Sequence, residues 1–323
     1  MSLPKVSVIG AGQVGAMVAE HIAIKELADV YLFDVVDGVA KGKSLDIMEG
    51  MPHWKSDSFM EGFTVGQNGE NYENLKGSEI VVMTAGLARK PGMSRDDLLY
   101  KNVDIIKGAA ENIKKYAPES TVIVVTNPMD IMTYAAYRVL NPKKNKIMGM
   151  GGTLDSGRFR TFIAKELGVS VEDVTAFVVG GHGDDMVPFV RYCSVGGIPL
   201  TELMSKEKID QIVTRTRGGG GEIVSYLKTG SAYYAPGISV TVMVESILKD
   251  KKRVITAPAL LDGELGQYYG ATGLFVGVPI KIGRNGVEEI YKMNFDEEER
   301  RLWNTSVSHV NESVQKVNTY LRW

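Results

Sequence analysis

Two short clusters in the second half of the chain combine side chains that can move a proton and hold an anion. His182 lies in Gly180-Gly181-His182-Gly183-Asp184, and Asp155 and Arg158 lie in Leu154-Asp155-Ser156-Gly157-Arg158. An imidazole titrates near neutral pH, so it can donate or accept a proton, and a carboxylate can orient it. A guanidinium can grip a carboxylate through two hydrogen bonds. Beside a dinucleotide site, these groups are the parts that a combined hydride and proton transfer needs.

A glycine-rich turn near the N-terminus supplies the candidate dinucleotide site. Residues 10–15 match G-x-G-x-x-G, directly after an apolar strand and at the start of a helix. The glycines permit a tight turn, close approach to a pyrophosphate and close packing of helix on strand, and the helix start holds the phosphates. Asp34 ends the next strand, where a carboxylate bonds ribose hydroxyls and repels a 2′-phosphate, so we expect NAD rather than NADP. The residues of the turn expected to bind the cofactor are Gly10, Gly12, Gln13, Val14 and Gly15.

Strands and helices alternate through the first half of the chain. Apolar runs at 6–9, 30–33, 80–84 and 121–125 predict strands, and the runs 14–24 and 95–116 predict helices. Ser94 is the expected N-cap of the second helix, with acidic residues in its first turn. The pattern predicts an α/β fold with a doubly wound, Rossmann-type parallel sheet.

The regular alternation of strands and helices ends after about Lys146, which indicates a second, α+β domain that binds substrate. We expect helices at 155–167, 206–217 and 222–227 and near Pro236, strands at 174–179 and 186–195, and an antiparallel pair at 254–261 and 274–282. The glycine run 218–221 should be mobile or sharply bent, and Pro258 should mark an edge strand or a bulge. A last helix should begin near Asp296, with Glu299 as its capping partner. The predicted domains are 1–148 and 149–323.

Composition excludes several classes of protein. The 323 residues suit two domains, and a net charge of −2 gives no general attraction to nucleic acid or to a membrane. No apolar run is long enough to span a bilayer, and no basic region followed by an apolar stretch suggests a signal peptide before the first strand. The single cysteine, Cys193, predicts a packing residue in a reducing compartment. We therefore expect a cytoplasmic protein, with a processed organelle form as the alternative.

Metal binding and two other nucleotide motifs find no support in the sequence. The remaining histidines stand alone and no C-x-x-C is present, so no metal site is expected. Residues 38–44 imitate a P-loop, but only three residues separate the glycines where that motif needs four. Tyr72 and Lys76 have the spacing of the short-chain dehydrogenase pair but precede the strand expected at 80–84. We interpret the first as a loop leading into a helix and the second as coincidence.

Taken together, the motifs resemble those of the lactate/malate dehydrogenase family, most closely its malate dehydrogenases built on the lactate dehydrogenase plan. The segments that carry the resemblance occur in the family's order and are 10–15, Asp34, 85–95, Thr126-Asn127-Pro128, 154–158 and 180–184. The resemblance implies NAD-dependent oxidation of malate to oxaloacetate by a homo-oligomer, a dimer or a tetramer. The alternatives are a lactate dehydrogenase on the same scaffold and a dinucleotide-binding protein without catalysis.

The resemblance also implies a role for each site residue. His182 would exchange the proton of the substrate oxygen, and Asp155 would fix its tautomer. Arg158 would bind the C1 carboxylate, and Arg95 would polarise the reacting carbonyl. The other expected contacts are Asn127 to substrate and nicotinamide ribose, and Asn102 and Val125 to the cofactor.

Arg89 would decide the substrate, because in this family the corresponding loop position distinguishes C4 dicarboxylates from pyruvate. Its guanidinium would pair with the second carboxylate of oxaloacetate, whereas closure of the loop 87–94 over pyruvate would bury it unpaired. That penalty is about 3–5 kcal/mol by analogy with a broken buried ion pair. It corresponds to roughly 100- to 5,000-fold discrimination.

Overall fold

The computed structural model describes residues 3–66, 69–87 and 94–323, and for Arg95 the backbone only. Its first part contains, in order, β1 (Lys5–Ile9), α1 (Gln13–Ile24), β2 (Asp29–Asp34), α2 (Val39–Trp54), β3 (Met60–Thr64), the 3-10 helix η1 (Tyr72–Leu75), β4 (Ile80–Met83), α3 (Arg95–Tyr116), β5 (Thr121–Val124), α4 (Met129–Leu140), the 3-10 helix η2 (Lys144–Lys146) and β6 (Ile147–Gly149).

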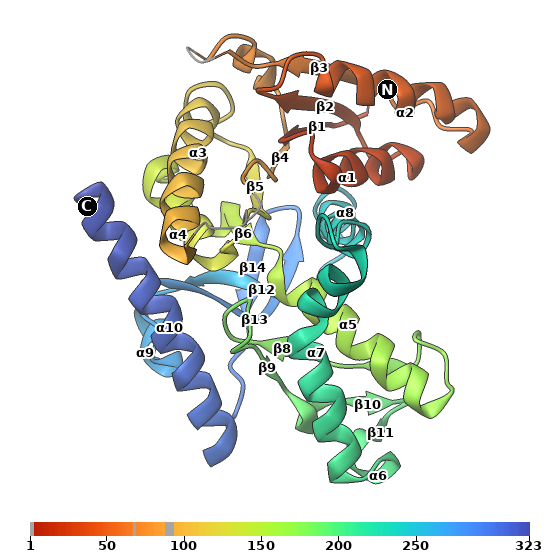
Figure 1. The fold of residues 1–323 in the computed structure, drawn as a ribbon, viewed down its shortest axis with the longest axis vertical. Helices are drawn as coiled ribbons and strands as arrows, with labels where there is room; N and C mark the ends of the chain where they lie inside the picture. Colours follow the sequence, from red (N-terminus) through yellow and green to blue (C-terminus); the bar gives the residue numbers. More distant parts are fainter. Residues whose placement is uncertain (1–2, 67–68, 88–93) are drawn as a thin grey trace.

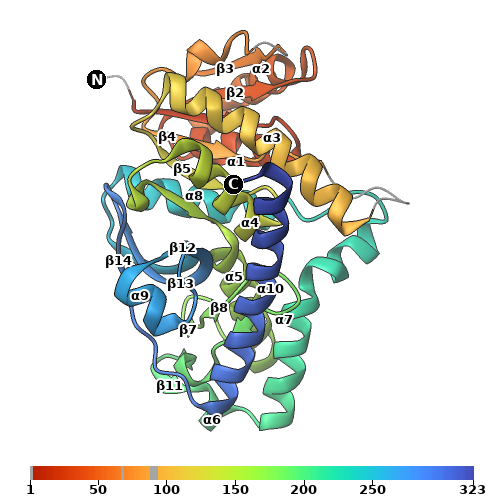
Figure 2. The same ribbon diagram turned by 90° about the vertical axis from the view of Figure 1, so that its left-hand side faces the viewer.

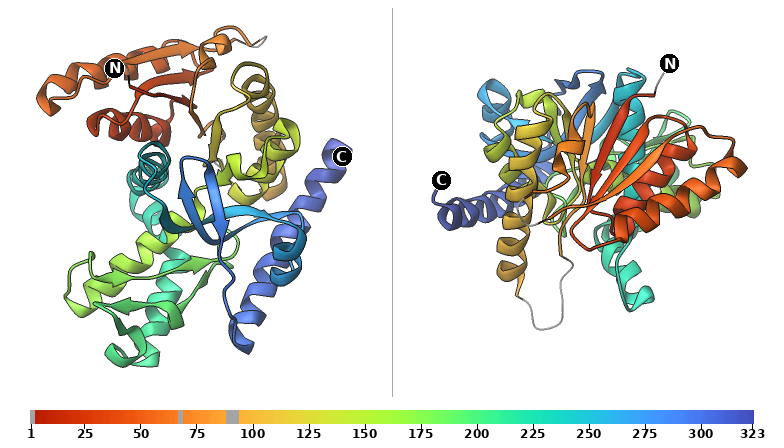
Figure 3. Two further views of the ribbon diagram at one scale, coloured as in Figure 1. Left: turned by 180° about the vertical axis from the view of Figure 1, so that it is seen from behind. Right: turned by 90° about the horizontal axis from the view of Figure 1, so that it is seen from above.

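The strands of this part form one parallel sheet in the order β3-β2-β1-β4-β5-β6. This is the strand order of a doubly wound dinucleotide fold, so the predicted fold class is confirmed. α1, α2 and α8 lie on one side of the sheet and α3 and α4 on the other (Figures 1 and 3). The first three strands extend the sheet to one side of β1 and the next three to the other, and ligands of such sheets bind at the carboxyl ends of the strands where this switch occurs, here β1 and β4.

Helix α3 shows how the local sequence fixes an element that carries site residues. Its apolar residues at steps of three and four, from Leu99 to Ile113, are all buried. Ser94 accepts the N–H of Asp97, whose side chain in turn accepts the N–H of Ser94, so both partners of a capping box are present. The predicted start of this helix is therefore confirmed, and it places Arg95 at the first helical position.

The second part of the chain builds smaller sheets against long helices (Figure 1). Its elements are α5 (Gly151–Leu167), β7 (Val174–Thr175), β8 (Val178–Val179), β9 (Val187–Pro188), the 3-10 helix η3 (Val190–Tyr192), β10 (Ser194–Val195), β11 (Ile198–Pro199), α6 (Leu200–Leu203), α7 (Lys206–Leu227), α8 (Tyr234–Leu248), β12 (Arg253–Leu261), α9 (Gly263–Tyr269), β13 (Leu274–Gly283), β14 (Gly286–Ile290) and α10 (Glu297–Leu321).

Several predicted elements of this part are confirmed. β12 and β13 pair antiparallel, and β12 is an edge strand of the sheet β12-β13-β14, as Pro258 indicates. α10 begins after Asp296, with the predicted capping box to Glu299. The runs at 174–179 and 186–195, in contrast, are broken into short strands and a 3-10 turn. α5 begins four residues before the expected Asp155.

The expected break at the glycine run is wrong, because α7 continues as one helix through residues 218–221. The reason lies in its packing against α5. A Cβ atom at Gly219 would lie 3.3 Å from Cδ of Arg158 on that neighbouring helix. Tertiary contact therefore overrides the low helix propensity of glycine, which costs about 1 kcal/mol per residue relative to alanine.

Two helices of the second part pack back on the first. α8 lies against α1, where a Cβ at Gly237 would come within 2.5 Å of the Met17 side chain. α10 runs beside α4 toward α3 (Figure 2), and Lys316 near its end pairs with Asp96 in the first turn of α3 at 2.8 Å. None of the helices in the described ranges combines the length and apolar character needed to cross a bilayer.

Candidate active site

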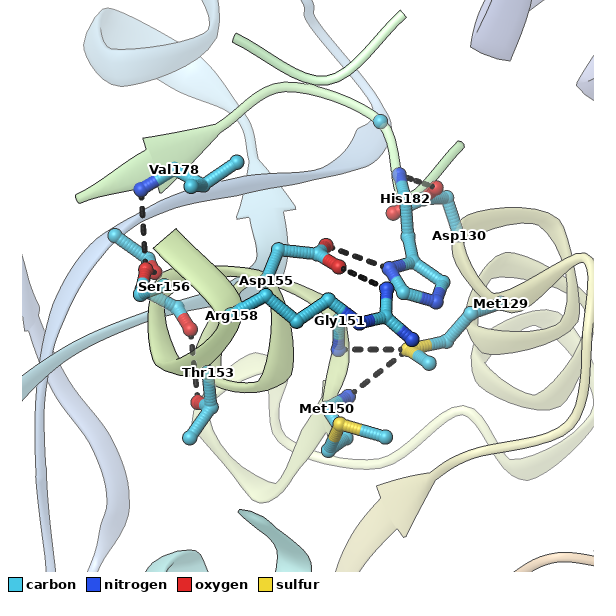
Figure 4. Close-up of polar contacts among 12 residues, drawn as sticks. Met129, Asp130, Met150, Gly151, Thr153, Asp155, Ser156, Arg158, Val178 and His182 are labelled. Atoms are coloured by element: carbon cyan, nitrogen blue, oxygen red, sulfur yellow. Dashed lines mark hydrogen bonds and ion pairs between the residues drawn. The ribbon is translucent and has the colours of Figure 1, made fainter. Parts of the chain in front are cut away.

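Helix α5 and the loop 180–183 bring three of the predicted residues together. Asp155 and Arg158 are one turn apart on α5 and face the same side. Asp155 Oδ2 lies 2.7 Å from Nδ1 of His182, and its Oδ1 lies 3.1 Å from Nη1 of Arg158. One carboxylate thus joins the imidazole and the guanidinium (Figure 4). The convergence of these three residues, expected from scattered sequence positions, is present.

The backbone around His182 is fixed by three different elements. Gly180 exchanges two backbone hydrogen bonds of 2.9 Å with Gly277 of β13. Gly181 donates its N–H to Oγ of Ser306 on α10 at 2.8 Å, and His182 donates its N–H to Oδ2 of Asp130 on α4 at 2.7 Å. The loop is therefore held at the histidine and at the two residues before it, which fixes the position of the ring.

The imidazole is in an environment that favours its protonated form. Burial alone would lower the pKa of His182. The negative charge and hydrogen bond of Asp155 and the charge of Asp130 outweigh that burial and the repulsion from Arg158. The pKa of His182 is therefore raised above its usual value. A raised pKa keeps a proton available for donation near neutral pH.

Arg158 is a nearly buried cation with part of its hydrogen-bonding capacity unused. Its side chain is 14% exposed, and its Nε atom has no hydrogen-bond partner among the described residues. It packs against Gly219 and Gly220, which lack side chains that would displace it. A buried guanidinium of this kind is suited to an anionic ligand.

Backbone N–H groups at the start of α5 have an unusual hydrogen-bond acceptor. Met129 Sδ accepts the backbone N–H groups of Met150 at 3.1 Å and Gly151 at 2.8 Å (Figure 4). No side chain of the N-cap residue itself takes this role. Gly151 also permits the approach of the imidazole, since a Cβ there would lie 2.9 Å from Cβ of His182.

The glycine turn at the start of α1 has the geometry that a dinucleotide requires. A Cβ at Gly15 would lie 1.8 Å from the carbonyl oxygen of Gly10, so only glycine allows this packing. A Cβ at Gly12 would meet nothing within 4 Å, and no side chain caps the N-terminus of α1. Open space in front of uncapped backbone N–H groups fits a pyrophosphate.

Asp34 braces this turn from the end of β2. Its carboxylate accepts the N–H of Ala11 at 2.7 Å and the N–H of Val36 at 2.9 Å. Each oxygen retains a second lone pair for a ribose hydroxyl. Asp34 thus holds the glycine turn in shape and places a carboxylate beside it.

Two asparagines link the ends of neighbouring strands. Asn127 follows β5 and its side chain is exposed, whereas Val125 before it is buried. Asn102, on α3, is buried and uses its amide to hold the backbone of Leu87 and the carbonyl of Asn127. Asn102 therefore fastens Leu87, the first residue of the predicted specificity loop, to the segment that carries Asn127.

Some predicted features lie elsewhere or outside the described residues. Arg89, the loop 88–93 and the side chain of Arg95 lie outside them. Tyr72 is packed against Phe33, and burial raises its pKa to about 12, in keeping with a packing residue. Cys193 is likewise buried, and burial raises its pKa to about 12. Among the described residues, no group of three or more His, Cys, Asp or Glu side chains is arranged to hold a metal ion.

Asp130 is the site residue that sequence reasoning missed. An acidic residue in the first turn of a helix is common because the dipole favours it, so it gave no distinct signal. Its place directly after Asn127-Pro128-Met129, at the end of a parallel strand, is the signal that points to the site.

Comparison with known protein families gives matches over both parts of the chain. Residues 4–149 match the sequence model described as lactate/malate dehydrogenase, NAD binding domain. Residues 152–320 match the one described as lactate/malate dehydrogenase, alpha/beta C-terminal domain.

Individual relatives match over nearly their whole length. The malate dehydrogenase of Thermoplasma volcanium is 60% identical over 322 residues, which cover 100% of this chain and 99% of that protein. The apo structure of malate dehydrogenase from Picrophilus torridus is 57% identical with a TM-score of 0.97, covering 99% of this chain and 98% of that one. The lactate dehydrogenase of Cryptosporidium parvum, solved with lactic acid and β-nicotinamide adenine dinucleotide, is 41% identical with a TM-score of 0.91, covering 98% of both chains.

Proposed function

The chain belongs to the lactate/malate dehydrogenase family, and from that membership we propose that it is an NAD-dependent malate dehydrogenase. The reaction is the reversible oxidation of (S)-malate to oxaloacetate. The observation that carries this proposal is the shared carboxylate of Asp155, which joins a proton-exchanging imidazole to a cation suited to a substrate carboxylate.

Each residue of the cluster has a defined role in this reaction. In the reducing direction, protonated His182 donates its proton to the oxygen of the keto group, and in the oxidising direction the neutral ring accepts it. Asp155 accepts the Nδ1–H, which leaves Nε2 as the atom that faces substrate. Arg158 binds the C1 carboxylate, and Asn127 donates a hydrogen bond to the substrate. Arg95 stabilises the negative charge that develops on the carbonyl oxygen.

NAD is the cofactor in this proposal and, when bound, accepts or returns the hydride of C2. The turn at 10–15 and the start of α1 hold its pyrophosphate, and Asp34 bonds its adenosine ribose. Val125 and Asn127 lie at the carboxyl end of β5, where the nicotinamide half is expected. Asn102 was predicted to contact the cofactor, but it is buried with its amide bonded to Leu87 and Asn127, so we propose that it acts on the cofactor through those two residues.

The substrate assignment depends on Arg89. We propose that its guanidinium pairs with the second carboxylate of oxaloacetate, which pyruvate lacks. The names of the relatives at 58–60% identity, all malate dehydrogenases, support this choice over lactate dehydrogenase.

Steady-state kinetics with oxaloacetate and pyruvate, each with NADH and NADPH, test the substrate and cofactor assignments. We expect oxaloacetate with NADH to have the highest kcat/KM, and a higher value for pyruvate would overturn the assignment in favour of lactate dehydrogenase. Arg89→Gln should lower kcat/KM for oxaloacetate and raise the value for pyruvate relative to it. An unchanged ratio of the two values removes the role of Arg89.

The alternative of a non-catalytic dinucleotide-binding protein is tested at His182. His182→Asn should abolish turnover while NADH binding, followed by fluorescence, stays near the wild-type value. Substantial residual turnover would contradict the role of His182. Binding of NADH by the wild-type protein without turnover of either keto acid would favour the non-catalytic alternative.

We further propose that the chain forms a homo-oligomer in the cytoplasm, with its domain boundary near residue 148. Large apolar side chains support the assembly: Trp54 on α2 and Tyr234 on α8 are each 60% exposed. A partner subunit packed on α2 and α8 would remove these side chains from water. Sedimentation analysis should give a dimer or a tetramer, and a monomeric mass at micromolar concentration would exclude the assembly.

A further inference from the structure

A second buried carboxylate lies behind the pair formed by His182 and Asp155. Asp130, in the first turn of α4, is 3% exposed, and its Oδ2 accepts the backbone N–H of His182 at 2.7 Å. Its other oxygen, Oδ1, has no hydrogen-bond partner among the described residues. Figure 4 shows it on the opposite side of the histidine from Asp155. A carboxylate buried in this way is costly unless positive charge compensates it.

Two sources of positive charge face Asp130. One is the N-terminal end of α4, whose dipole favours an anion in the first turn. The other is His182 in its protonated form. Burial raises the pKa of Asp130 to about 6, and the charge and backbone N–H of His182 act against that rise. The coupling is mutual, because the charge of Asp130 also raises the pKa of His182.

The remaining charged groups nearby are paired with one another or turned to solvent. Asp130 and His182 line a cavity of ≈ 570 Å³ between α3, α4 and α10. In its wall, Asp96 pairs with Lys316, and Asp185 pairs with His309. Asp184 in the same wall is exposed, and Asp155 and Arg158 on α5 bond each other. Among the described residues, the imidazolium of His182 is therefore the cation that is electrostatically coupled to Asp130.

We propose that Asp130 is a positioning residue that also acts electrostatically, because its carboxylate fixes the main chain of His182 and selectively stabilises the protonated imidazole. The inference rests on the proposed role of His182 as the group that exchanges the substrate proton. It predicts an asymmetry between the two directions of the reaction. Loss of the charge should weaken keto acid reduction, which starts from protonated His182, more than malate oxidation, which starts from the neutral ring.

A neutral side chain on α10 that bonds the same loop allows the electrostatic effect to be separated from simple bracing. Ser306 bonds the N–H of Gly181, the residue before the histidine, without carrying charge. Asp130→Asn keeps an oxygen for the N–H of His182 and removes the charge. Ser306→Ala removes a brace and leaves the charge. A purely structural role of Asp130 would make the two variants alike in their pH dependence.

The test is the pH profile of kcat/KM in both directions for the wild type, Asp130→Asn, Ser306→Ala and Asp185→Asn. Asp185→Asn removes a charge in the wall of the same cavity that is paired with His309, so it shows how far the loss of a neighbouring charge alone moves the midpoints, and its shift should be smaller than that of Asp130→Asn. In Asp130→Asn, both midpoints should move to lower pH by about 0.5–1 unit. Above the midpoint, oxaloacetate reduction should then fall about 3- to 10-fold. Ser306→Ala should lower kcat with unmoved midpoints. Unmoved midpoints in folded Asp130→Asn overturn the proposal.

A second measurement covers the case in which Asp130→Asn does not fold. Because the coupling is reciprocal, His182→Asn should raise the pKa of Asp130, seen by infrared spectroscopy as a protonated buried carboxyl that persists to higher pH. An unchanged carboxyl signal overturns the proposal. A failure of the proposed function is distinguishable from a failure of this inference, because in that case the wild-type protein itself does not turn over oxaloacetate.

Discussion

Gly219 and Arg158 are packed so closely that a Cβ atom at position 219 would lie 3.3 Å from Cδ of the arginine. The two residues belong to neighbouring helices, α7 and α5. The absence of a side chain on one therefore sets the position of the guanidinium on the other. The helix passes close to Arg158 at Gly219 and Gly220, where the missing side chains leave room for the guanidinium.

Substitution at this contact should change substrate binding rather than the chemical step. Gly219→Ala should raise KM for oxaloacetate several-fold, since Arg158 must move by a few tenths of an ångström. Gly221→Ala is the matched control, because a Cβ there meets nothing within 4 Å. It should stabilise the protein by about 0.5–1 kcal/mol through helix propensity, with KM unchanged. Equal KM values for the two variants would contradict the steric role of Gly219.

Asp34 should govern the choice between the two nicotinamide cofactors. Asp34→Ser removes the charge that repels a 2′-phosphate, so the preference for NADH over NADPH should fall about 10- to 100-fold in kcat/KM. KM for NADH should rise as well, because the brace on Ala11 is weakened. Asp37→Asn, an exposed change three residues on, should leave the preference unaltered. A preference retained in Asp34→Ser would refute this assignment.

Met129 should stabilise the start of α5 through its sulfur. Met129→Leu keeps the volume but leaves the N–H of Gly151 without its acceptor, which costs about 1–3 kcal/mol, whereas the N–H of Met150 keeps its bond to the carbonyl oxygen of Val124. Met132→Leu, equally buried on the same helix, is the control and should cost less than about 1.5 kcal/mol as a volume-conserving change. Urea denaturation measures both, and a Met129→Leu variant as stable as the control would count against the sulfur contacts.

Glu245 links α8 to the end of α1 and should make stability depend on acid pH. Hydrogen bonds from Lys25 and Lys251, followed by the charge of Lys25, lower its pKa from 4.5 to about 2. A folded-state pKa below the unfolded value adds stability above about pH 4.5 that is lost as the pH falls toward 2.

The corresponding variant is Glu245→Gln. Because the lysines are largely exposed, we expect it to cost only about 1 kcal/mol at pH 7, and the difference should shrink progressively below pH 4.5. Glu264→Gln, in an ion pair whose carboxylate is 82% exposed, should have almost no effect at either pH. A difference for Glu245→Gln that is independent of pH would show that the ion pair is not its cause.

The sequence was informative where local pattern and tertiary packing agree. The apolar steps of α3 and the caps at Ser94 and Asp296 predicted their helices because burial and local hydrogen bonding act in the same direction there. The prediction for the glycine run was wrong because helix propensity counts only the cost of glycine within one helix, whereas the compensating contacts are made with α5. The first turn of α5 was missed for a related reason, since the N–H of Gly151 at its start is accepted by a methionine that precedes no recognisable capping pattern in the sequence.

The site residues, too, could be predicted only where the local sequence is distinctive. Motifs identified His182, Asp155 and Arg158 because their residue types and spacing are distinctive. Asp130 has an ordinary type in an ordinary place, and only the approach of the loop 180–183 in space gives it a partner. Long-range hydrogen bonds between a helix start and a distant loop leave no periodic trace in the chain.

The carboxylate of Asp155 contributes to two functions, because it sets the proton affinity of His182 and also holds the guanidinium of Arg158 that is proposed to bind the acid group of the substrate. The two functions cannot be changed independently. A substitution that reorients Arg158 for a bulkier or differently charged substrate also alters the carboxylate of Asp155, and with it the imidazole of His182. Attempts to widen the substrate range are therefore best directed at the far end of the substrate, where the anchoring does not pass through the histidine.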